Sequence, residues 1–130
     1  MRLERGDEIV SSLKEFCVKA NVSAGAVTGI GAVGEAQLGF FEAKSKQIKF
    51  KKIFGDHEIC SLTGNITQLN HLPYLHLHIV LSNEKMECFG GHLKSARVSA
   101  TSEIMVFSLE GKIGRKFSEE IGLNLIEFQE

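Results

Sequence analysis

The sequence lacks the features that mark several large classes of protein. It has one proline, no tryptophan and three cysteines in 130 residues. No stretch approaches the roughly 20 consecutive apolar residues that a membrane-spanning helix needs. The 15 lysines and arginines nearly balance 16 acidic residues, for a formal net charge of -1. Because DNA-binding domains usually carry a basic excess or a concentrated basic face, any DNA contact here would need a local patch.

The three cysteines, Cys17, Cys60 and Cys88, are odd in number and form no CxxC motif. One falls on the apolar face of an expected helix and two fall in strand-like runs, so we expect buried, reduced thiols. Reduced thiols indicate a reducing compartment. The first ten residues, MRLERGDEIV, are charged and lack the apolar segment of a secretory signal. We therefore expect a cytoplasmic protein with no membrane segment.

The chain length suits a single domain, which we expect over residues 1–130. Residues 7–20 carry apolar side chains at the spacing of one helix face, with Asp7 and Glu8 at the end where negative charge suits the helix dipole. Beyond residue 24, short alternating runs predict strands, and the acidic tail from Ser118 is expected to hold a short helix or a last strand at Leu125–Phe128. The other expected strands are Arg2–Glu4, Ala26–Ile30, Gly34–Phe41, Gln47–Phe54, Glu58–Thr63, Leu75–Leu81, Met86–His92 and Val98–Leu109.

One helix followed by many short strands predicts an α+β fold: a mostly antiparallel β-sheet with an N-terminal helix and few further helices. Residues 29–34, GIGAVG, match the letters of the dinucleotide-binding GxGxxG motif. That motif also needs a following helix and an acidic residue about 20 positions later. Here a strand-like run follows, and Ile48-Lys49-Phe50 stands at that distance. We therefore interpret these glycines as a turn between two strands.

The segment LHLHIVL, residues 75–81, is the most informative part of the sequence. Successive strand side chains point to opposite faces, so its leucines and isoleucine share one face while His76 and His78 share the other. Side chains two apart on a strand are separated by roughly 6.5–7 Å, which two imidazoles can span to reach one ion with bonds of about 2.0–2.1 Å. This pattern indicates a metal site, although two histidines on a polar sheet face and an unrelated third would give the same letters.

His92, in the run FGGHL, is the candidate third ligand. If Ser82 pairs with Met86 across a three-residue loop, His76 lies directly opposite His92 on the same face. A two-residue loop would place His92 on the other face unless a bulge corrected it, and Gly90-Gly91 is a sequence that supports a bulge.

Three neutral histidines with one open position are typical of a catalytic or ligand-binding zinc, and another divalent transition metal remains an alternative. Glu103, in an otherwise apolar strand, is a candidate acid–base group because a buried carboxylate needs a partner. His57 and His71 are interpreted as solvated turn residues. Five lysines between residues 44 and 52 form either a phosphate-contacting patch or the protected edge of a strand; they are Lys44, Lys46, Lys49, Lys51 and Lys52.

Several of these runs together resemble the plants-and-prokaryotes-conserved (PPC) domain. They are GIGA at 29–32, EICSLTGN at 58–65, LHLHIVLSN at 75–83, FGGHL at 89–93 and TSEI at 101–104. The resemblance implies an α+β fold, a homotrimer and, as for other stand-alone prokaryotic members, a predicted DNA-binding role. Plant members carry AT-hooks, whereas this chain has no Arg-Gly-Arg core. The set His76, His78 and His92 matches the prokaryotic pattern, and the fold is similar to that of acetolactate decarboxylase, which holds zinc with an HxH…H arrangement.

Three functions are therefore expected to compete. The first is a DNA-associated or regulatory PPC module with a three-histidine zinc site. The second is a zinc-dependent lyase or hydrolase that acts on a small carbonyl or carboxylate compound, with Glu103 moving protons. The third is a structural protein in which the metal only fixes a hairpin or a subunit junction.

Overall fold

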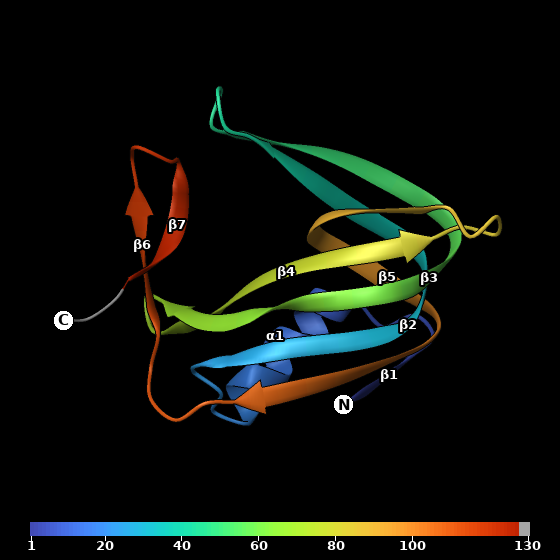
Figure 1. The fold of residues 1–130 in the computed structure, drawn as a ribbon. Coiled ribbons are helices and arrows are strands. Elements are labelled where there is room, and N and C mark those ends of the chain that lie inside the picture. Colours follow the sequence, from blue (N-terminus) through green and yellow to red (C-terminus); the bar gives the residue numbers. More distant parts are fainter. Residues whose placement is uncertain (128–130) are drawn as a thin grey trace.

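The structure is a computed structural model that describes residues 1–127. Figure 1 shows the arrangement of its one helix and its strands. These elements pack around a single apolar core. No helix in this range is long and apolar enough to cross a membrane. The elements are β1 Arg2–Glu4, α1 Ile9–Lys19, β2 Gly25–Glu42, β3 Gln47–Leu69, β4 Leu72–Ser82, β5 Cys88–Ser108, β6 Gly114–Ser118 and β7 Leu123–Glu127.

The strands form one sheet in the order β1-β5-β2-β3-β6-β7, with β4 paired to both β3 and β5. Because β2 also pairs with β3 and β5, these four long strands close into a ring. Every pairing within residues 1–127 is antiparallel except a parallel bridge between Gln68 and Gly114. The predicted α+β class, with a mostly antiparallel sheet and an N-terminal helix, is confirmed.

The strands are longer than the sequence predicted, because the segments between expected strands bend the chain and do not end it. The predicted strands at 26–30 and 34–41 lie within β2, and those at 47–54 and 58–63 lie within β3. Those at 86–92 and 98–109 are joined in β5, which begins two residues later and ends one residue earlier than predicted. The interpretation of GIGAVG as a turn is therefore wrong. The register shifts between Gly29 and Gly31 and again between Val33 and Glu35, so β2 curves without breaking. Gly31 has φ 148° and lies against the backbone of Thr101 and Ser102, where a Cβ would overlap.

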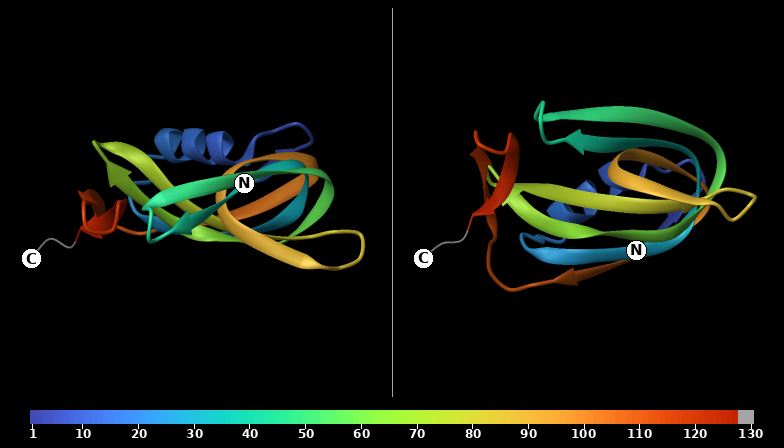
Figure 2. Two further views of the ribbon diagram at one scale, coloured as in Figure 1. Left: turned by 90° about the horizontal axis from the view of Figure 1, so that it is seen from above. Right: turned by 45° about the horizontal axis from the view of Figure 1, so that its top comes forward.

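The helix α1 covers one face of the ring (Figure 2). Glu8 is its N-cap, since its carboxylate accepts hydrogen bonds from the backbone N–H of Val10 (3.1 Å) and Ser11 (2.7 Å). The acidic residues therefore precede the helix, which begins two residues later than predicted. Its buried residues Ile9, Leu13 and Cys17 are each 0% exposed. They pack in one core with side chains from every long strand, including Val27, Leu62, Ile66, Leu77, Ile79, Leu81 and Ile104.

The strands β6 and β7 pair with each other and form a C-terminal hairpin. The sequence predicted a helix or a strand at Leu125–Phe128 and no strand at Gly114–Ser118; β7 supplies the strand, and Phe128 lies outside the described residues. At its base, the N–H of Gln68 in β3 donates to the carbonyl of Ile113 (2.8 Å). At its turn, Lys46 Nζ donates to the carbonyl of Glu119 (2.7 Å). The hairpin thus spans from the end of β3 to the tip of the β2–β3 hairpin, as Figure 1 shows.

Candidate metal centre and its cavity

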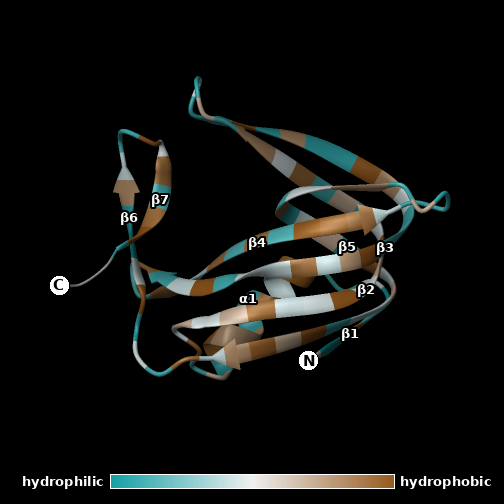
Figure 3. Ribbon diagram, viewed as in Figure 1, coloured by the Kyte–Doolittle hydropathy of each residue, from teal (hydrophilic) through white to brown (hydrophobic). Residues whose placement is uncertain are grey.

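Apolar and polar residues alternate along the strand β4, visible as bands in Figure 3, and their side chains lie on opposite faces of the strand. Leu77, Ile79 and Leu81 point into the core and are at most 1% exposed. His76 and His78 point to the opposite side, where His78 is exposed and His76 is half-buried. The predicted division of this strand between core and histidine face is therefore confirmed.

The β4–β5 pairing places His92 on the same side, in a different register from the one predicted. Ser82 pairs with Cys88, not with Met86, so His92 lies directly opposite His78 and not His76. The longer loop is held by Asn83, whose side-chain oxygen accepts from the N–H groups of Lys85 (2.9 Å) and Glu87 (3.1 Å). The register differs from the prediction by two residues, and a shift of two keeps every side chain on its face.

The two glycines before His92 form no bulge against β4, because this pairing is continuous from His78 to Ser82. Their role is close packing. A Cβ on Gly91 would lie 2.7 Å from the carbonyl oxygen of Gly39 in β2, and one on Gly90 would overlap the carbonyl oxygen of Ile79. The glycines therefore let β5 pass tightly between its neighbours and carry His92 to the histidine face.

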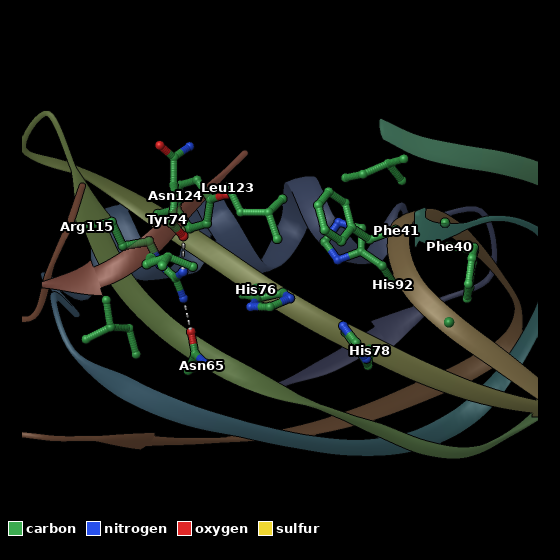
Figure 4. A pocket seen from close by; sticks show the side chains of 15 residues that line it. Phe40, Phe41, Asn65, Tyr74, His76, His78, His92, Arg115, Leu123 and Asn124 are labelled. Atoms are coloured by element: carbon green, nitrogen blue, oxygen red, sulfur yellow. Dashed lines mark hydrogen bonds between the residues drawn. The ribbon is translucent and has the colours of Figure 1, made fainter. Parts of the chain in front are cut away.

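The three imidazoles turn toward one another, as Figure 4 shows. Ring centroids are 5.1 Å apart for His76 and His78, 5.4 Å for His76 and His92, and 5.7 Å for His78 and His92. One nitrogen from each ring lies within 4.8 Å of the others. Small side-chain rotations would bring three nitrogens within the roughly 2.0–2.1 Å bond length of a single zinc ion. The residues present therefore fit a metal held by three imidazoles.

The surroundings favour the neutral form of two of these rings. Burial lowers the pKa of His76, and the nearby charges of His78 and Arg115 lower it further. Burial also lowers the pKa of His92, with added contributions from the other two histidines and Lys94. Because only neutral imidazole ligates a metal, both effects prepare the cluster for a cation near neutral pH.

The cluster opens into a cavity of ≈ 690 Å³, within the usual range of small-molecule sites. Strands β2 to β5 form one side, and the C-terminal hairpin forms the other. No carboxylate lines it among residues 1–127. Its lining residues are Gly39, Phe40, Phe41, Ile48, Asn65, Tyr74, His76, His78, Gly91, His92, Arg115, Leu123, Asn124, Leu125 and Ile126.

Arg115, which the sequence did not single out, enters this cavity from β6. Its guanidinium lies over the ring of Tyr74, with the carbon 4.7 Å from the ring centroid. Its Nε donates to Thr67 Oγ1, and its two terminal nitrogens donate to the carbonyl of Asn124 and to Asn65 Oδ1, each at 2.7 Å. Burial lowers the pKa of Arg115, although an arginine stays protonated at any physiological pH. These contacts hold a positive charge beside the histidine cluster.

The structure does not bring Glu103 to the cluster. Glu103 is exposed on β5, where it pairs with Arg2 of β1 and Ile30 of β2, and it lines a separate cavity. The sequence predicts a carboxylate in an apolar strand, but the Glu103 side chain points outward and is solvated. His71 is an exposed turn residue with φ 64°, as interpreted. His57 is not in a turn: it lies in β3, with its ring centroid 5.4 Å from that of Phe89.

The cysteines divide between core and surface. Cys17 is buried, as predicted, whereas Cys60 and Cys88 are exposed. The prediction was wrong for Cys60 because the inward positions of β3 are filled by Ile59 and Leu62. It was wrong for Cys88 because this residue lies at the exposed start of β5. Interaction with the neighbouring Cys60 thiol raises the pKa of Cys88.

The lysine-rich segment lies on the β2–β3 hairpin. All five lysines are exposed, and residues 47–54 of β3 pair with β2 alone within the described chain. This arrangement fits a strand edge guarded by charge. Lys49 forms an ion pair with Glu42.

The chain is therefore an α+β protein with a ring of antiparallel strands. Its three-histidine cluster opens into a cavity lined by both apolar and polar side chains. Its residues 1–110 match the Plants and Prokaryotes Conserved (PCC) domain, and the chain belongs to this family. The resemblance found in the sequence is thus confirmed. A comparison with curated proteins gives no match.

Solved structures agree in fold over nearly the whole chain. A candidate DNA-binding protein from Bacteroides thetaiotaomicron is 36% identical, with a TM-score of 0.95 over 98% of this chain and 89% of that one. A metal-containing protein from Archaeoglobus fulgidus is 33% identical, with a TM-score of 0.92 over 98% and 91%. A plant- and prokaryote-conserved protein from Pyrococcus horikoshii is 34% identical, with a TM-score of 0.93 over 100% and 90%.

Proposed function

We propose that this protein binds a divalent transition metal, zinc by default, on His76, His78 and His92, and uses it to hold a small molecule in the adjoining cavity. The observation that carries this proposal is the convergence of three imidazoles within 4.8 Å at the wall of a ≈ 690 Å³ cavity. The similarity to a metal-containing protein supports it. Three neutral nitrogen ligands suit zinc and leave a coordination position open, which separates this site from closed structural zinc sites.

The chemistry proposed for this site is that of a zinc-dependent lyase or hydrolase acting on a small carbonyl or carboxylate compound. Bound zinc would act as a Lewis acid that polarises a carbonyl or carboxylate oxygen. Arg115 would hold negative charge on the same compound, and the apolar wall would exclude water from it. Glu103 has no part in this proposal, because it lies outside the cavity.

The proposal is tested by metal analysis of the purified protein and of two matched histidine variants. We expect about one equivalent of metal per chain in the wild type and its loss in His78→Ala, because two imidazoles bind zinc far more weakly than three. His71→Asn is the control: it removes a histidine from an exposed turn with positive φ, which asparagine tolerates. Equal metal content in all three proteins, or none in the wild type, would refute the proposed site.

DNA association is the second candidate function. It is supported by the candidate DNA-binding protein among the structural relatives and by the exposed lysines of the β2–β3 hairpin. The near-zero net charge and the absence of an AT-hook weigh against it. A gel shift that weakens steeply with salt, and that is lost when Lys49, Lys51 and Lys52 become glutamate, would favour it over the small-molecule function.

A homotrimer is proposed on the family resemblance. Exposed apolar side chains on adjacent strands, Ile30 of β2 with Met105 and Phe107 of β5, support an interface on this part of the sheet. The oligomeric mass in solution tests it: we expect three chains per particle by light scattering, and a smaller mass for Phe107→Glu.

A further inference from the structure

Arg115 has hydrogen-bonding capacity that the protein does not use. A guanidinium has five N–H groups. Three of them donate, and all three acceptors are neutral oxygens, those of Thr67, Asn65 and Asn124. Within residues 1–127 no carboxylate lies within ion-pair distance of Arg115. A half-buried arginine that lines the cavity is thus held by neutral groups, and two of its N–H groups donate to no other group of the described chain.

Within residues 1–127, the charges at the cavity wall are positive and are not balanced by negative ones. A divalent metal on three neutral imidazoles would leave that centre with its full double charge, and Arg115 adds another positive charge nearby. The lining residues within the described chain include no aspartate or glutamate that could balance them. Because an uncompensated charge is costly away from water, the cavity is electrostatically incomplete without an anion. This step rests on the proposed metal function, although the guanidinium alone has the same preference.

The remaining walls restrict the kind of anion. Apolar side chains face the cavity from both sides, Phe41 and Ile48 from the β2–β3 hairpin, and Leu123 and Leu125 from the C-terminal hairpin. No lysine lines it among residues 1–127, and α1 lies on the other face of the sheet. The several converging donors that phosphate sites use are therefore missing. A group with one flat anionic end and an apolar body fits these walls better.

The geometry points to a small monocarboxylate with an aliphatic chain as the ligand of this cavity. Its carboxylate lies between the histidine cluster and Arg115, and its chain lies between the two apolar walls. Arg115 is thereby a specificity-determining residue, supplied by the C-terminal hairpin and not by the part of the chain that matches the family domain.

The test is calorimetric binding of hexanoate to the zinc-loaded, full-length protein, with the metal content of each sample measured in parallel. We expect Arg115→Gln to weaken hexanoate binding by about 10- to 100-fold, the range for loss of a charged hydrogen-bond partner. Arg115→Lys should recover only part of the affinity, because an ammonium lacks the planar fork. Arg5→Gln is the matched control, since Arg5 is exposed. Unchanged affinity in a metal-replete Arg115→Gln protein would overturn the inference.

Two further ligands sharpen the test on the wild type. Hexanamide has the same shape without the charge and should bind far more weakly, whereas inorganic phosphate should bind more weakly than hexanoate because it has no apolar body. Hexanamide binding as tightly as hexanoate, or phosphate binding more tightly, would overturn the monocarboxylate assignment. Along the series acetate, butyrate and hexanoate, affinity should rise roughly three- to fourfold per buried methylene. A flat series would contradict the apolar walls even if the Arg115 variants failed to fold.

The two proposals can fail separately. A wild-type protein that retains zinc but binds no hexanoate would refute the carboxylate ligand and leave the metal site intact. A wild-type protein that takes up no zinc, but whose hexanoate binding still depends on Arg115, would refute the metal function and leave the anion site intact.

Discussion

The two faces of β4 differ in what they contribute, although they alternate along the same few residues. On one face, Leu77, Ile79 and Leu81 are almost fully buried and hold the strand against α1 and the rest of the core. On the other, the rings of His76 and His78 lie close to each other and to that of His92. Side chains that stabilise the fold and side chains of the candidate metal site therefore alternate along β4, because neighbouring side chains on a strand point to opposite sides.

The largest effect is expected on the core face. Leu77→Ala removes a side chain that is 1% exposed, and leaves a cavity in a packed interior. We expect the free energy of unfolding to fall by about 2–5 kcal/mol, measured by urea denaturation of the metal-free protein. If the loss were below about 1 kcal/mol, β4 would not be anchored as described.

Thr67→Val tests a polar group buried as completely as those leucines. Thr67 is 1% exposed; its hydroxyl accepts from Arg115 Nε and donates to the carbonyl of Tyr74. Valine keeps the shape but leaves both partners unsatisfied, so we expect a loss of about 1–3 kcal/mol in the same denaturation experiment. Thr67→Ser keeps the hydroxyl and is the control. Equal losses in both variants would show that packing, and not the hydrogen bonds, matters at this position.

On the histidine face, His78→Ala should leave the metal-free protein almost as stable as the wild type, within about 0.5 kcal/mol, because the side chain is exposed. Its effect should emerge only with zinc, which should raise the melting temperature of the wild type and not that of the variant. If His78→Ala strongly lowered the stability of the metal-free protein, the histidine face of β4 would also stabilise the fold, contrary to the comparison above.

The smallest expected effect is that of pH on the metal-free protein. The pKa values of His76 and His92 are lowered in the folded state, so the unfolded chain binds more protons as the pH falls through about 6.5. Folding stability should therefore be fully present above that pH and decline below it. Denaturation midpoints compared between about pH 5 and 8 should show this slope, and His76→Gln should reduce it. An opposite slope would contradict the assignment.

The alternation of LHLHIVL was enough to predict the core face of β4 and the histidine pair, because strand geometry leaves no other choice. The position of His92 beside this pair was predicted despite a wrong register, since an error of two residues preserves the face of His92. Strand lengths were not predictable in the same way. A glycine that bends a strand and one that ends it look alike in sequence, and only the backbone contacts of Gly31 with β5 distinguish them.

Arg115 could not be predicted at all. Its contacts to Thr67 and Asn65 span 48 and 50 residues, and no spacing in the sequence relates the C-terminal hairpin to the histidines. The misplacement of Glu103 has the same origin. The sequence predicts the strand that carries Glu103. It does not predict how far this residue lies from the histidines, because that depends on long-range strand pairing that the local pattern does not contain.

The C-terminal hairpin separates the residues that line one side of the cavity from the residues that form the histidine cluster. The histidines lie within the stretch that matches the family domain, whereas one side of the cavity comes from the residues that follow it. Under the proposed function, changes in the sequence of β6 and β7 would alter which compounds bind without moving the three histidines. Replacing β6 and β7 of one family member with those of another would then transfer the preference for a ligand.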